Sequence, residues 1–127
     1  MHNSDQQESA VMMFLDKEHQ MEYTRILSKM SSTNAQHASF AYLVSFVKAP
    51  IGDCFDFEKD SIKTDMFECS WATGMSRSVL TLAQNLWDST IPADVSDVFG
   101  YVDDVYAEFL YYAIQIRFGY APYFLCI

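Results

Sequence analysis

Basic residues, glycine and proline are scarce in this sequence, and a long apolar run is absent. Its 127 residues include 8 Lys and Arg against 17 Asp and Glu, so the formal net charge is −9. Direct binding of nucleic acid needs a basic face that neutralises phosphates, and this composition leaves little material for one. Neither a run of about 18 apolar residues nor a basic-then-apolar leader occurs. We therefore expect no direct nucleic-acid binding and no membrane insertion.

Cysteine is also rare, with Cys54, Cys69 and Cys126 far apart in the chain. An odd, widely spaced set argues against the disulfide framework of a secreted protein, so we expect free thiols, mostly buried, and a cytoplasmic location. Structural zinc uses closely spaced Cys or His pairs, and neither the cysteines nor His19 and His37 form one. No zinc site is expected.

Four glycines are too few for a phosphate-binding loop, and neither common glycine-rich motif occurs. Asp56, Glu58 and Asp60 alternate as calcium ligands do. Counted from Asp56, however, the sixth and twelfth places of a calcium loop hold Ser61 and Phe67 instead of Gly and Glu. We therefore expect no metal and no cofactor, and we assign no catalytic residue.

Apolar residues recur at helical spacing in four stretches. These predict helices at about residues 17–30, 35–47, 76–87 and 101–118. Asp16 and Asn34 are predicted to cap the first two helices, and Gly119 is predicted to end the last. The second helix shows the clearest one-sided apolar pattern in the first half of the chain. A short helical turn at 55–60 and a short helix at 93–99 are expected in the two acidic connections.

The pattern as a whole predicts an all-α fold, a compact bundle of about four main helices with long acidic irregular connections and little or no strand. We expect one domain over residues 1–127, with residues 1–8 frayed and residues 120–127 forming an apolar C-terminal tail. The core is expected to include Trp71, Trp87 and Tyr101. His19 and His37 are expected at the surface. Arg77 is expected to form an ion pair with an acid from the middle of the chain.

Negative charge is concentrated between residues 49 and 108, where twelve acids stand against Lys59, Lys63 and Arg77. One interpretation is that these acids only increase solubility. The functional interpretation is an acidic face that binds a basic protein surface, with aromatic side chains as buried anchors. The acids assigned to that face are Asp53, Asp56, Glu58, Asp60, Asp65, Glu68, Asp94, Asp97, Asp103 and Asp104.

Several segments also resemble, in order, a family of small uncharacterised proteins of Firmicutes that are often met on phages, plasmids and integrated elements. The segments are residues 14–19, 55–58, 71–77, 82–87 and 112–117. The resemblance spans most of residues 13–118 and implies a bacterial cytoplasmic protein of a mobile element. It supplies no established activity and no catalytic residues.

Three hypotheses of function follow. The first is a non-enzymatic module that binds a host protein, in its specific form an anti-CRISPR-like inhibitor covering the basic surface of a nucleic-acid-handling protein. The alternative is a small ligand-binding or enzymatic domain with a pocket between helices, using His19 or His37 with Arg77. The third is a homo-oligomer formed through the C-terminal tail that runs from Tyr120 to Ile127.

Overall fold

The computed structural model describes residues 11–123, and in this part of the chain the fold is mainly helical, as predicted. Four helices of 13 to 15 residues correspond to the four predicted ones, and two short helices, one 3-10 helix and one two-stranded sheet join them. In chain order the elements are α2 (Lys17–Lys29), α3 (Ala35–Val47), α4 (Ile51–Cys54), β1 (Phe55–Asp56), β2 (Ser61–Ile62), η1 (Thr64–Glu68), α5 (Gly74–Trp87), α6 (Val95–Phe99) and α7 (Asp104–Phe118). No helix within residues 11–123 is long and apolar enough to cross a bilayer.

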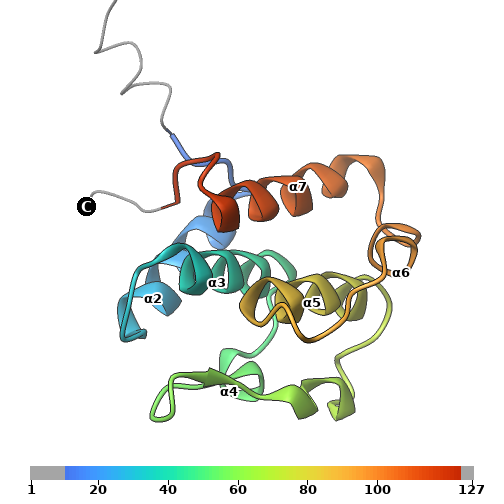
Figure 1. Cartoon of the computed structure of the whole chain (residues 1–127). Helices are drawn as coiled ribbons and strands as arrows, with labels where there is room; N and C mark the ends of the chain where they lie inside the picture. The colour runs from blue at the N-terminus through green and yellow to red at the C-terminus, as the bar shows by residue number, and fades with distance from the viewer. Residues whose placement is uncertain (1–10, 124–127) are drawn as a thin grey trace, which may run out of the picture.

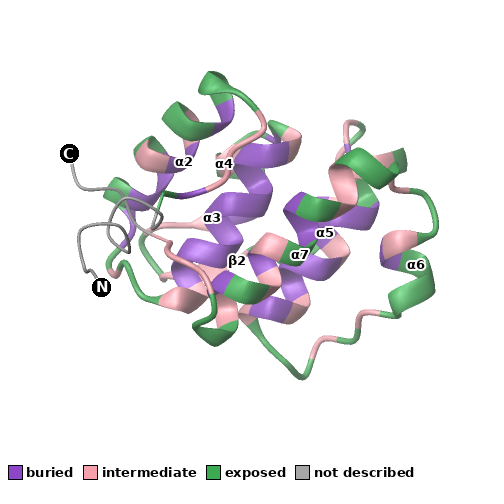
Figure 2. Ribbon diagram, turned by 90° about the horizontal axis from the view of Figure 1, so that it is seen from above, coloured by how far each residue is buried: buried purple, intermediate pink, exposed green. Residues whose placement is uncertain are grey.

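Helix α3 is the centre of the molecule, in contact with α2, α5 and α7 (Figure 1). Every residue from His37 to Phe46 is buried, and Figure 2 shows this helix buried along most of its length. The one-sided burial that the apolar pattern of residues 35–47 indicated was therefore wrong. Neighbours cover α3 on several sides, so Tyr42, Ser45 and Phe46 are buried as well as Phe40, Leu43 and Val44.

The ends of the main helices follow the capping chemistry in the sequence. The Asp16 carboxylate accepts the backbone N–H of His19 at 2.8 Å, and the Asn34 side chain accepts the N–H of His37 at 2.9 Å. Each bond satisfies a donor that the first helical turn leaves without a partner. Gly119 ends α7 at φ +85°, a backbone conformation that suits glycine.

The helical turn predicted at 55–60 was wrong, because this segment forms a β-hairpin. Strand β1 pairs antiparallel with β2, with Phe55 opposite Ile62. The Asp56 carboxylate accepts the N–H groups of Glu58 and Lys59 at 3.0 and 3.1 Å, and these bonds hold the turn closed. An aspartate that bonds backbone two and three residues ahead competes with a helix.

The segment from α4 to η1 lies beneath α3 and α5, whereas α6 lies at one end of the molecule between α5 and α7 (Figure 1). Trp71 and Trp87 are half-buried against the core. Tyr101 was predicted to be core but is 79 % exposed. It lies in the link from α6 to α7, because α7 begins at Asp104 and not at the predicted residue 101.

Candidate functional site

The ten acids assigned to one face lie in two groups. We call the first group the hairpin acids; they lie on the segment from α4 to η1 and are Asp53, Asp56, Glu58, Asp60, Asp65 and Glu68. We call the second group the α6–α7 acids; they are Asp94, Asp97, Asp103 and Asp104, at α6 and the start of α7. Figure 1 shows these two segments on different sides of the molecule.

Half of the hairpin acids make hydrogen bonds that support the fold. The Asp53 carboxylate accepts the indole N–H of Trp71 at 2.9 Å, Asp56 closes the hairpin turn, and Asp60 pairs with His37 at 2.8 Å. The other three, Glu58, Asp65 and Glu68, are exposed and have no ion-pair partner within residues 11–123.

The α6–α7 acids make fewer hydrogen bonds than the hairpin acids do. Asp94 caps α6 by accepting the N–H groups of Ser96 and Asp97. The carboxylates of Asp97, Asp103 and Asp104 make no hydrogen bond or ion pair to the described residues. Residues 88–116 contain no Lys or Arg at all.

Glu108 extends the α6–α7 acids by one helical turn. It is exposed on α7, four residues after Asp104, so the two carboxylates share a face of the helix. It was not among the predicted binding residues, although the i,i+4 spacing in the sequence carried the signal.

Large apolar side chains are exposed beside these acids. Val95 is 72 % exposed, Tyr101 79 %, Val105 64 % and Tyr111 52 %. The ring of Phe99, at the end of α6, stacks on Tyr111 of α7 with centroids 5.3 Å apart, which places the end of α6 next to α7. We call the exposed side chains of this region, with its acids and Glu108, the α6–α7 face.

His19 is fully buried, so the prediction that it lies at the surface was wrong. Its Nδ1 accepts the backbone N–H of Leu15 at 3.0 Å, which leaves Nε2 to donate to the carbonyl of Tyr42 at 3.0 Å. The ring is therefore the neutral tautomer with its proton on Nε2. Burial lowers the pKa of His19 to about 4, because the charged ring loses its water.

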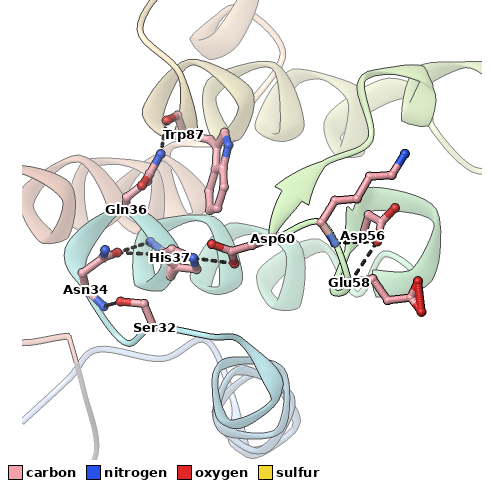
Figure 3. A network of polar contacts seen from close by, with 9 residues as sticks. Ser32, Asn34, Gln36, His37, Asp56, Glu58, Asp60 and Trp87 are labelled. Atoms are coloured by element: carbon pink, nitrogen blue, oxygen red, sulfur yellow. Dashed lines mark hydrogen bonds and ion pairs between the residues drawn. The ribbon is translucent and has the colours of Figure 1, made fainter.

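His37 is also buried, 4 % exposed, and lies between two oxygen acceptors (Figure 3). Its Nδ1 is 2.7 Å from Asn34 Oδ1 and its Nε2 is 2.8 Å from Asp60 Oδ1. Asn34 Oδ1 already accepts a backbone N–H, so both ring nitrogens face oxygen acceptors. Hydrogen bonds from His37 and then Ser31 hold the pKa of Asp60 below its ordinary value.

Neither histidine is available for acid–base chemistry, because both nitrogens of each ring are engaged inside the protein. The two rings therefore do not join Arg77 in a pocket, as the enzymatic alternative expected. Arg77 instead lines a groove between α5 and α6 that neither histidine lines.

The predicted ion pair of Arg77 is also absent. Its guanidinium lies 4.6 Å from the ring centroid of Phe67, and Nη1 donates to the Phe67 carbonyl at 3.2 Å. No carboxylate of the described residues lies within ion-pair distance of it.

The two cysteines that the structure describes are free thiols, as predicted. Cys54 is buried, and burial raises its pKa to about 12. Cys69 is half-buried, and Cys126 lies outside the described residues. Within residues 11–123 no cluster of three or more His, Cys, Asp or Glu side chains could hold a metal ion.

The described part of the C-terminal tail contacts its own chain. Ala121 and Tyr123 pack against the core, and the Tyr112 hydroxyl donates to the carbonyl of Pro122 at 2.8 Å. Tyr120 is exposed, and residues 124–127 lie outside the described part. Oligomer formation through this tail stays a prediction.

Comparison with known proteins assigns the chain to a family without a known activity. The model of DUF6075, a family of unknown function, matches residues 9–124, so the chain belongs to this family. No curated protein and no solved structure matches it.

Proposed function

For this member of a family of unknown function, we propose a non-enzymatic role in which the α6–α7 face binds a basic surface of another protein. One observation carries the proposal. Exposed apolar side chains, Tyr101 and Tyr111 among them, lie among acids that have no cationic partner within the described residues.

The chemistry of this face is that of a binding surface with anchors and a charged rim. Tyrosine contributes a large apolar area and a hydroxyl at low entropic cost, and aromatic residues dominate binding energy at many interfaces. The surrounding carboxylates would attract Lys and Arg of the partner, speeding association and setting orientation. Because the acids already repel one another, a basic partner also relieves that repulsion.

The hairpin acids fit this role less well. Three of them hold the hairpin, Trp71 and His37 in place, and Lys59 and Lys63 reduce the local charge. None of the large apolar side chains that are strongly exposed lies between residues 53 and 68. The proposed binding surface therefore keeps only the α6–α7 acids of the predicted face.

In its specific form, the partner is a nucleic-acid-handling protein of a bacterial host, and the chain is a cytoplasmic, anti-CRISPR-like inhibitor from a mobile element. The support for this form is the acidity of the face, since a surface that binds phosphates is basic, together with the resemblance described above.

The experiment compares two triple variants with the same change in charge. The first neutralises the α6–α7 face with Asp103→Asn, Asp104→Asn and Glu108→Gln. These residues make no side-chain hydrogen bond to the described residues, so the fold is expected to persist.

The matched control removes three charges from the hairpin acids with Glu58→Gln, Asp65→Asn and Glu68→Gln. The wild-type chain and both variants, each tagged, are incubated with host lysate at low salt, and the retained proteins are compared by mass spectrometry. Each retained protein is then purified, and its affinity for all three chains is measured at two salt concentrations.

We expect one basic protein that the wild type and the control retain equally and the α6–α7 variant loses. Its affinity is expected to fall steeply with salt, because exposed charges are screened within about 10 Å at 0.1 M salt. Equal retention by both variants, or a partner insensitive to salt, would contradict the proposal.

A further inference from the structure

A groove of about 580 Å³ lies between the first turns of α5 and the α6 region. This volume lies within the range, about 300 to 1,000 Å³, that binds small molecules. Its polar and apolar lining comes from Met75, Arg77, Ser78 and Thr81 on one side and Asp97 and Tyr101 on the other.

Arg77 enters this groove as a cation without a carboxylate partner. Phe67 holds the guanidinium through its ring and its carbonyl, and that carbonyl takes only one of the five N–H donors. The chain has about twice as many acids as bases, yet no carboxylate of the described residues pairs with Arg77. Its remaining donors are free to bind an anionic oxygen group bidentately.

Ser78 adds a second, independent sign of a ligand. It is only 7 % exposed and lines the groove, and its hydroxyl has no hydrogen-bond partner among residues 11–123. The nearby α5 hydroxyls differ, since Ser76 donates to the carbonyls of Trp71 and Thr73 and Thr81 donates to that of Arg77. Because its oxygen is not fully buried, this hydroxyl is free to bond to a molecule that enters the groove.

Asp97 and Tyr101, on the other side of the groove, offer an acceptor and an aromatic ring where Arg77 and Ser78 offer donors. The Asp97 carboxylate can accept from an ammonium or another N–H donor, and the Tyr101 ring offers an exposed flat face. The groove thus holds one cation and one anion that do not pair with each other.

We propose that this groove binds a zwitterionic small molecule, an amino acid or short peptide. Its carboxylate would bind Arg77 and Ser78, its ammonium would bind Asp97, and its side chain would lie on Tyr101. A net charge of −9 disfavours a multiply charged anion such as a nucleotide, whereas a zwitterion fits the balanced lining. The groove shares Asp97 and Tyr101 with the α6–α7 face, but binding of a small molecule here does not require the proposed docking on another protein.

The test uses the isolated full chain, labelled with ¹⁵N, and three sets of probes. These are the twenty free L-amino acids, a panel of dipeptides with aromatic residues, and adenosine monophosphate with inorganic phosphate. Saturable shifts of backbone amides are measured up to concentrations of about 1 mM, the weak end of specific affinity. We expect at least one amino acid or dipeptide to shift the amides of the groove, and the nucleotide and phosphate to leave them unchanged.

Two variants connect the shifts to the groove. Ser78→Ala is expected to weaken binding about tenfold, since a hydrogen bond to a charged group is lost, and Asp97→Asn is expected to weaken it similarly. Ser28→Ala and Asp65→Asn, exposed and outside the groove, are the matched controls and are expected to bind as the wild type does.

Three results would overturn the proposal: no saturable shift with any amino acid or dipeptide, equal affinity in Ser78→Ala and Ser28→Ala, or binding of adenosine monophosphate in preference to every zwitterion. Because no partner protein is present, none of these results bears on the α6–α7 face as a docking surface.

Discussion

Tyr23 and Tyr42 lie edge to face in the core, with ring centroids 6.1 Å apart and planes at 78°, yet only one of their hydroxyls is satisfied. The Tyr42 hydroxyl donates to the carbonyl of Met13 at 2.6 Å. The Tyr23 hydroxyl is buried without a hydrogen-bond partner in the part of the chain that the structure describes. The Tyr42 hydroxyl is therefore expected to stabilise the fold, and the Tyr23 hydroxyl to destabilise it.

Replacing each tyrosine with phenylalanine tests this difference. Tyr23→Phe removes a desolvated hydroxyl that gains nothing in return, so the free energy of unfolding is expected to rise by about 1 kcal/mol. Tyr42→Phe deprives the Met13 carbonyl of its donor and is expected to lower it by about 1 kcal/mol. Urea unfolding of both variants measures the two changes, and equal losses would show that Tyr23 has a partner outside residues 11–123.

The buried His19 makes stability depend on pH. Its pKa falls from 6.5 to about 4 on folding. Between these values the unfolded chain binds a proton that the folded chain does not, so the free energy of unfolding falls as the pH falls. Its contribution is complete above about pH 6.5, and about 3 kcal/mol is lost on reaching about pH 4.

The control is His19→Gln, because glutamine can accept from Leu15 and donate to Tyr42 without titrating. Urea unfolding across this pH range is expected to show a shallower slope for the variant than for the wild type. Parallel slopes would mean that His19 binds its proton equally well in both states.

The pair of His37 and Asp60 is expected to contribute more to stability than an exposed acid does. Asp60→Asn leaves the His37 ring without its carboxylate acceptor and is expected to lower the free energy of unfolding by about 1 kcal/mol. The matched Asp65→Asn, at an exposed carboxylate without a partner among the described residues, is expected to change it little. Since folding lowers the pKa of Asp60, the advantage of the wild type over Asp60→Asn is expected to disappear as the solution is acidified below about pH 4. An advantage that persists in strong acid would show that the ionised Asp60 carboxylate is not its source.

Gly119 and Gly52 allow the cost of backbone strain to be measured without steric crowding. At neither residue would an added Cβ meet another atom within 4 Å, but Gly119 has φ +85° whereas Gly52 lies within α4. Gly119→Ala is expected to lower the free energy of unfolding by about 1 kcal/mol, and Gly52→Ala to raise it by about 0.5 kcal/mol. Thermal unfolding of both variants measures the difference, and a stable Gly119→Ala would mean that α7 ends differently.

Local chemistry made much of the fold predictable. The caps Asp16 and Asn34 act on N–H groups three residues ahead, and Gly119 acts on its own backbone, so each signal lies within one helical turn. The error at residues 55–60 was local too. The Asp56 carboxylate accepts the N–H groups two and three residues ahead, which favours a turn, and apolar spacing does not reveal this feature.

The surroundings of the histidines could not be predicted in the same way. His19 bonds to Tyr42, and His37 to Asp60, in each case 23 residues away. A polar residue is usually exposed, and only knowledge of the distant partner reverses that expectation. The groove has the same origin, because Ser78 and Asp97 come together only after α6 folds against α5.

The position of α3 has a consequence for how the molecule opens. Its backbone amides from His37 to Phe46 lie under α2, α5 and α7, so partial fraying at either terminus leaves them covered. These amides are expected to exchange their hydrogens with solvent only when the whole chain unfolds. The slowest exchanging amides of α3 would then report the global free energy of unfolding under native conditions, without denaturant.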